Sequence, residues 1–76
     1  EMDKIKQLIS SDLALITLRD DIAKISDNEL KNGAITASVY LDDLTDLYEA
    51  KSKKAMHEVQ LTLAEANYYL LKGVTP

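Results

Sequence analysis

The chain is 76 residues long, lacks cysteine and carries a net charge of −4 from 13 acidic and 9 basic side chains. So short a chain builds only a small core. Without cysteine it has no disulfides, and a single histidine is not enough for a structural zinc site. Its stability therefore has to come from association or from a larger protein around it. The acidic balance argues against nucleic-acid binding, which needs a basic surface, and no run of about 20 apolar residues occurs that would span a membrane.

The first predicted element is a helix over about residues 2–31, where neither Gly nor Pro interrupts the chain. The residues that open the chain, 1–4, have no apolar stretch after them, so we expect any export signal to lie outside this sequence. The segment Ser26–Glu29 matches a capping box, which leaves open an early break and restart of the helix. Two apolar stripes with spacings of three, four and seven favour a coiled coil: Leu8, Leu15, Leu18, Ile22 and Ile25, and Ile5, Ile9, Leu13 and Ile16.

A tight turn is predicted at about residues 32–35. Gly33 takes a left-handed conformation at no steric cost and so ends a helix well. Ile35 is placed to make the apolar contact that often accompanies such an end, and the Thr36 hydroxyl is placed to cap the next helix.

The second predicted helix covers about residues 36–72 and also carries two stripes. One stripe is assigned to helix seam packing: Leu41, Leu44, Tyr48, Val59, Leu63, Ala66 and Leu70, with Ala55 between them. Its companion is Leu47, Ala50, His57, Leu61, Ala64, Tyr68 and Leu71. Because packing against one neighbour needs one apolar stripe, two stripes imply two neighbours, in a wall of helices or in a dimer of hairpins. The predicted fold is all-α, an antiparallel two-helix coiled-coil hairpin over 1–76 that associates into a larger helical bundle.

The polar residues favour packing and solvation over chemistry, so we expect no enzyme, no cofactor and no metal site. His57 is predicted to lie at a helix–helix contact rather than to act as a base or ligand. The acidic residues Asp42, Asp43 and Asp46 are predicted to form a solvated face, because neighbouring positions on a helix diverge and do not surround a cation. The basic residues of 51–54 are likewise expected to be solvated, and the four tyrosines to be partly buried packing residues.

The stretch LKNGAITASVYLDDL, residues 30–44, resembles the periplasmic hairpin tip of TolC-like outer-membrane efflux proteins. The resemblance continues through LYEA at 47–50, HEVQL at 57–61, AEANY at 64–68 and KG at 72–73. It covers most of the chain from residue 30 onward, whereas the first helix matches by pattern alone. No single tripeptide in it is specific; the ordered series is.

The resemblance implies that the chain is one hairpin, of the C-terminal repeat, from a larger homotrimeric channel in the cell outer membrane, with this segment in the periplasm. Whole members serve tripartite efflux or type I secretion, and their tips meet a periplasmic adaptor (membrane fusion) protein that links the tunnel to an inner-membrane transporter. Carried over by position, Asp42 has a role in tip gating or faces the lumen, whereas Val39 stands where relatives often carry an acidic residue. The adaptor-docking tip is assigned to Asn32, Gly33, Ala34, Ile35 and Thr36.

Two other classes of function stay open on the residues alone. A stand-alone coiled-coil interaction module would show the same stripes without needing a docking tip. A small helical enzyme or metal carrier would depend on His57. Cut from a tunnel, the hairpin exposes its stripes, so we expect the isolated chain to self-associate.

Overall fold

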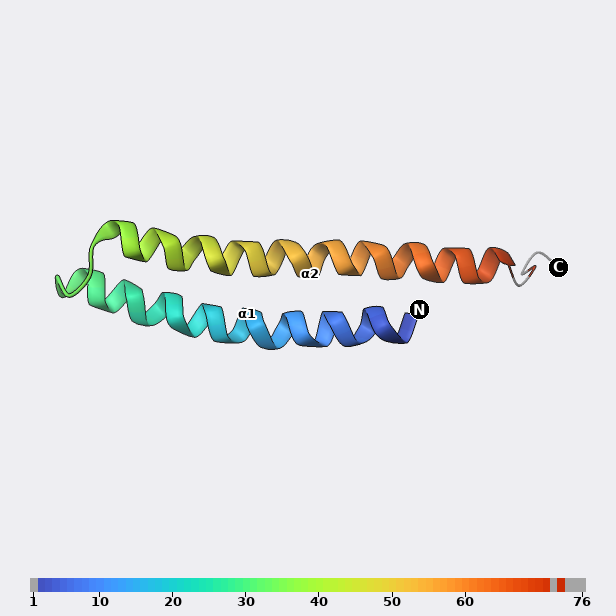
Figure 1. Ribbon diagram of the computed structural model, residues 1–76, viewed down its shortest axis with the longest axis horizontal. Coiled ribbons are helices and arrows are strands. Elements are labelled where there is room, and N and C mark those ends of the chain that lie inside the picture. Colours follow the sequence, from blue (N-terminus) through green and yellow to red (C-terminus); the bar gives the residue numbers. More distant parts are fainter. Residues whose placement is uncertain (1, 72, 74–76) are drawn as a thin grey trace.

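The computed structural model describes residues 2–71 and 73, and these form two helices joined by a tight turn (Figure 1). Helix α1 spans Met2–Lys31 and helix α2 spans Ala37–Leu71. The helices pack against each other in antiparallel directions, which confirms the predicted all-α hairpin. The molecule is a rod of 64 × 15 × 15 Å with a radius of gyration of 18.1 Å. A compact domain of this length would have a radius of about 11 Å.

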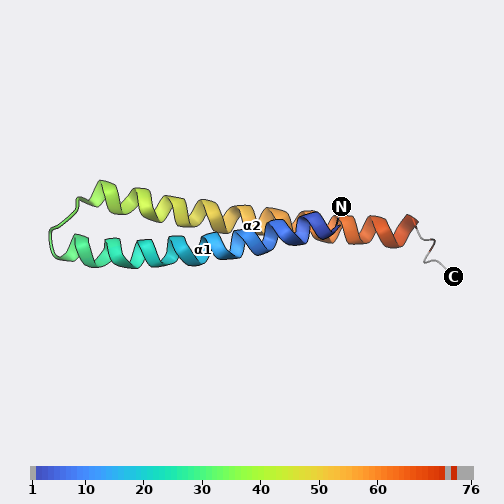
Figure 2. The same cartoon turned by 60° about the horizontal axis from the view of Figure 1, so that its bottom comes forward.

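A single seam joins α1 to α2, and its residues recur with alternating spacings of three and four. Every residue of the seam is buried or half-buried. In α1 these residues are Ile5, Ile9, Asp12, Ile16, Arg19, Ala23, Ser26 and Leu30, and in α2 they are Tyr40, Asp43, Leu47, Ala50, Lys54, His57, Leu61 and Ala64. The average spacing of 3.5 is that of a left-handed coiled coil. In Figure 2 the two ribbons stand apart at the turn and overlap near the start of α1.

Two polar contacts across the seam mark the register of the helices. Asp12 pairs with His57, and Ser26 pairs with Asp43. The steps from Asp12 to Ser26 and from His57 back to Asp43 are equal, two heptads each, as an unbroken antiparallel ladder requires. Helix α1 is continuous through Ser26, so the early break that the capping box left open does not occur. The Ser26 hydroxyl is used across the seam and not as a cap.

The stripe assigned to seam packing does not form the contact between α1 and α2. Only Leu44 of that stripe is half-buried, and the others are exposed: Leu41 58%, Tyr48 63%, Val59 59%, Leu63 59% and Leu70 74%, with Ala66 exposed as well. The companion stripe makes the contact instead as far as Ala64. Beyond it, α2 runs past the start of α1, and Tyr68 and Leu71 are exposed (Figure 1). That a second neighbour covers the first stripe stays a prediction.

The α1 stripes also differ from their predicted grouping. Ile5, Ile9 and Ile16 lie in the seam, whereas Leu13 is 55% exposed and the seam position beside it belongs to Asp12. Within the described residues, neither helix is long and apolar enough to cross a membrane.

Candidate functional site

The tip of the hairpin is built by a left-handed glycine at the end of α1. Gly33 has φ +76°, its amide donates to the carbonyl of Leu30 at 3.0 Å, and the amide of Ala34 donates to the carbonyl of Glu29 at 2.8 Å. These two hydrogen bonds define a Schellman motif with Gly33 just after the helix. They satisfy carbonyls that the helix end would otherwise leave without partners.

Thr36 closes the other side of the turn as the N-cap of α2. Its hydroxyl accepts a hydrogen bond from the amide of Val39 at 3.3 Å, and its carbonyl accepts from the amide of Tyr40 at 3.2 Å. The predicted cap is therefore confirmed, and α2 begins one residue after it, at Ala37. The predicted helical position at Lys72 lies outside the described residues.

The five residues assigned to docking lie together at one end of the rod. Asn32, Gly33, Ala34 and Thr36 are exposed, and Ile35 is half-buried. A Cβ built on Gly33 meets nothing within 4 Å. The chain itself therefore requires glycine for its backbone conformation and not for space, because the surroundings of Gly33 are open.

A valine at Gly33 is expected to destabilise the hairpin by about 1–2 kcal/mol, because a branched side chain is strained at positive φ. A valine at the neighbouring exposed Ala34, which lacks positive φ, is the matched control and should cost much less. The difference between the two variants is measured as a difference in melting temperature by thermal circular dichroism. For a domain of this size, 1 kcal/mol of unfolding free energy corresponds to about 4–8 °C. Equal melting temperatures of the two variants would contradict the conformational role of Gly33.

The seam carries a buried polar layer at Asp12 and His57. Their side chains are 9% and 17% exposed, and Nδ1 of His57 lies in hydrogen-bonding contact with Oδ2 of Asp12. An ionised carboxylate only accepts hydrogen bonds, so opposite ionised Asp12 the Nδ1 of His57 carries the hydrogen and donates the hydrogen bond to Oδ2. The prediction that His57 lies at a helix–helix contact is confirmed, and sequence reasoning missed its partner. The signal was available, because Asp12 stands three residues after Ile9 and four before Ile16.

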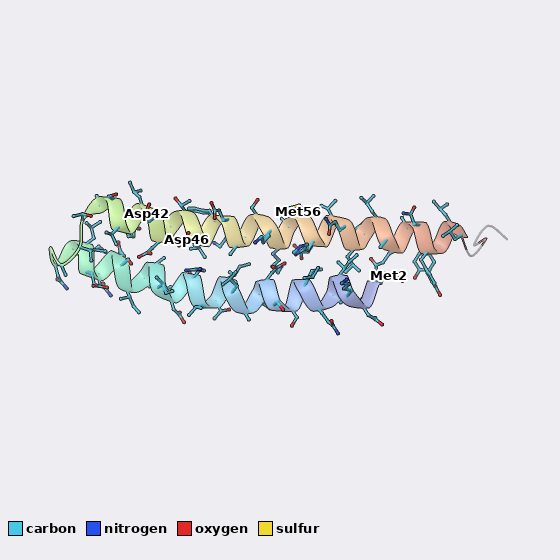
Figure 3. The ribbon with its side chains drawn as sticks, viewed as in Figure 1. Met2, Asp42, Asp46 and Met56 are labelled. Carbon is cyan, nitrogen blue, oxygen red and sulfur yellow. The ribbon has the colours of Figure 1, made fainter. Side chains whose placement is uncertain are left out.

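The predicted solvated acidic face is only partly correct. Asp42 is exposed, and Asp46 lies on the side of α2 that faces α1 (Figure 3). Asp43 accepts a hydrogen bond from Ser26, and Oδ2 of Asp46 lies 3.6 Å from Nη1 of Arg19. The reason is the 3.5-residue repeat, which places Asp43 in the seam and Asp46 on its edge. Asp42, the residue before Asp43, does not belong to the seam. Its role in gating or in the lumen stays a prediction.

Two charged pairs lie along α1, each between side chains four residues apart in the sequence. Lys31, the last residue of α1, pairs with Asp27 at 2.8 Å, and this hydrogen bond, reinforced by the negative charge of Asp27, raises the pKa of Lys31. Asp20 raises the pKa of Lys24 in the same way. These pairs are exposed and contribute little to stability.

Of the basic cluster in α2, Lys54 is half-buried and bonds Glu58 at 3.1 Å, while Lys51 lies 5.7 Å from the ring centroid of Tyr48. The predicted solvated face therefore holds for Lys51 and Lys53, and Lys54 occupies a seam position. Among the tyrosines only Tyr40 is half-buried, so the predicted partial burial is wrong for the other three. Tyr68 and Tyr69 make an edge-to-face contact at 5.6 Å.

Chemically, the described residues offer an exposed tip and exposed apolar stripes. No group of three or more His, Cys, Asp or Glu side chains in the described part of the chain is arranged to hold a metal ion. Comparison of the chain with protein-family models, with curated proteins and with solved structures finds no match.

Proposed function

We propose that this hairpin is a wall element of the periplasmic tunnel of an outer-membrane export component, and that its tip docks a periplasmic adaptor protein. Through the adaptor the tunnel would connect to an inner-membrane transporter for efflux or type I secretion. In that setting the whole protein is a homotrimer in the outer membrane. The family part of the proposal rests on the residue series from 30 onward.

The observation that carries the proposal is the exposed tip at the end of a long rod. The turn residues lie at one extremity of a 64 Å molecule, and their backbone is held by the Schellman motif and the Thr36 cap. A rigid, exposed turn with small side chains allows close approach of another hairpin, and binding then costs little ordering entropy.

The exposed stripes support the same proposal from the sides of the rod. Leu18 and Ile25 on α1 and Leu41, Val59 and Leu63 on α2 are each more than half exposed. Exposed apolar stripes on two helices are expected of an element that lies between neighbours. The polar layers of the seam would keep the hairpin in register while its outer faces pack against those neighbours.

Docking at the tip is tested by a tryptophan at Ala34, which is exposed and free of the positive φ of Gly33. The matched control is Ala55→Trp, at an exposed alanine about 27 Å along α2 from the start of that helix. Purified periplasmic adaptor proteins from the same cell are passed over each immobilised variant. We expect Ala34→Trp to weaken binding at least about tenfold, or ~1.4 kcal/mol, and Ala55→Trp to leave it unchanged.

The two variants also distinguish the alternative functions. Binding that survives Ala34→Trp would remove docking from the tip. Binding lost only in Ala55→Trp would favour a coiled-coil interaction module that uses the side of α2. Failure of every adaptor to bind the unaltered chain would contradict the docking proposal.

A further inference from the structure

Helix α1 carries a second heptad stripe beside its seam, here called the α1 flank stripe. Its members have the same alternating spacings of four and three: Lys4, Leu8, Ser11, Leu15, Leu18, Ile22, Ile25 and Glu29. None of them is buried: Leu8, Leu18 and Ile25 are 41%, 54% and 58% exposed, and Leu15 and Ile22 are half-buried. A strict 3.5-residue stripe is the pattern of a helix that packs along a second helix.

The α1 flank stripe is complementary to a second copy of itself that runs in the opposite direction. Two copies of α1 can be laid antiparallel with a twofold axis between Ile16 and Thr17. Leu15 of one copy then lies opposite Leu18 of the other, and Leu8 lies opposite Ile25. A twofold interface requires this self-complementary pattern of one surface.

The charges at the two ends of the stripe follow the same symmetry. In that register Lys4 of one copy lies opposite Glu29 of the other, so both ends of the contact bring opposite charges together. A parallel arrangement would place Lys4 against Lys4 and Glu29 against Glu29, which is unfavourable. The charge pattern therefore selects the antiparallel orientation.

The surface beside the stripe is shaped to receive another helix. A groove between α1 and α2 on this side is lined by Leu15 and Arg19 from α1 and by Glu49, Lys53 and Met56 from α2. A second stretch of groove near the start of α1 is lined by Leu8 and Leu63, among others. Apolar side chains from an adjacent helix would extend the buried area from the stripe into this groove.

We infer that the α1 flank stripe is the interface between two copies of this chain, packed antiparallel about a twofold axis into a four-helix assembly. The inference does not rest on the proposed function. It concerns the 76-residue chain outside any tunnel, where a second copy takes the place of the tunnel neighbour beside the flank stripe, and it assigns the interface to α1. The apolar stripe on the outside of α2 is less suited to this role, since Lys51 and Ser52 interrupt it between Tyr48 and Ala55.

The test is sedimentation equilibrium of the 76-residue chain with two matched substitutions. Leu18→Glu places a charge in the flank stripe, and Leu41→Glu places the same charge at a leucine of similar exposure on α2, 54% against 58%. We expect the unaltered chain and Leu41→Glu to be dimers, and Leu18→Glu to raise the dimer dissociation constant at least about 100-fold, because two unpaired charges enter the interface. Circular dichroism should show unchanged helicity in both variants, since neither leucine lies in the seam.

The orientation is tested by charge exchange and by cross-linking. Lys4→Glu and Glu29→Lys should each weaken the dimer, and the double variant should restore it. Because the chain lacks cysteine, Ser11→Cys chains can be oxidised alone or mixed with Ile22→Cys chains. In the antiparallel register Ser11 lies opposite Ile22 and about 16 Å along the axis from its own counterpart, so only the mixture should form a disulfide.

Several outcomes would overturn the inference. A dimer that survives Leu18→Glu, or one that is dissociated by Leu41→Glu instead, would move the interface off α1. Disulfide formation by Ser11→Cys alone would show a parallel pair. A chain that stays monomeric at about 1 mM would show that the stripe makes no dimer of useful stability.

Discussion

Leu47→Asp is expected to unfold the hairpin. Leu47 is 5% exposed, and it lines one groove between the helices together with Ala23, Asp20 and Asp27. The substitution loses the burial of a leucine, roughly 2 kcal/mol, and also places a carboxylate in the seam near two others. A chain below about 80 residues rarely has more than 3–5 kcal/mol of stability, so the combined loss exceeds what the hairpin can tolerate. Far-ultraviolet circular dichroism at 25 °C should show most of the helical signal lost.

Leu63→Asp is the control for this prediction. Leu63 is on the same helix and is also a leucine, but it is 59% exposed, so its replacement by aspartate should leave the helicity of the hairpin nearly unchanged. If Leu63→Asp unfolded the chain and Leu47→Asp did not, the seam would have been assigned to the wrong face of α2.

The hairpin itself could be predicted from the sequence because its signals are local. Gly33 and Thr36 act through their own backbone and side chain, and each does in the structure what its residue type predicts. The absence of Gly and Pro on both sides of the turn extends the same local argument to the two helices.

The choice of the seam could not be predicted in the same way, since it depends on which of two stripes faces the partner helix. Counting apolar residues favoured Leu41, Tyr48 and Val59, which are all exposed. The true seam contains small and polar residues, such as Ala50 and His57, that apolar periodicity undervalues. It becomes recognisable only when α1 is placed opposite, because Asp12 and Ser26 then supply the partners that satisfy His57 and Asp43. A partner for the proposed docking tip would be recognised through surfaces outside the chain, so the sequence alone does not define it.

The polar layer at Asp12 and His57 leads to the second large effect. Asp12→Leu removes the acceptor and leaves the Nδ1–H of the half-buried His57 without its partner in the seam, which we expect to cost about 2 kcal/mol. His57→Leu leaves a buried carboxylate without its donor and should cost at least as much. The double variant removes both polar groups and should recover most of the loss, as apolar replacements of buried polar pairs often do. Urea unfolding curves give the free energies of unfolding of the unaltered chain, the two single variants and the double variant. From these we expect a coupling energy between Asp12 and His57 of roughly 1–3 kcal/mol.

Two comparisons make this cycle specific to the Asp12–His57 layer. Asp12→Asn keeps an oxygen that accepts from Nδ1 and should be close to the unaltered protein. Arg19 and Asp46 are 37% and 45% exposed at 3.6 Å, and a cycle on that pair should give well under about 1 kcal/mol. Additive effects of Asp12→Leu and His57→Leu would mean that the two residues do not act as a pair. The double variant can also be stable and yet no longer hold one register, which disulfide mapping between the two helices would reveal. In that case the polar layer contributes more to the alignment of the helices than to their stability. Apolar layers of Leu, Ile and Ala can shift by a heptad at little cost, whereas a lone donor and acceptor cannot.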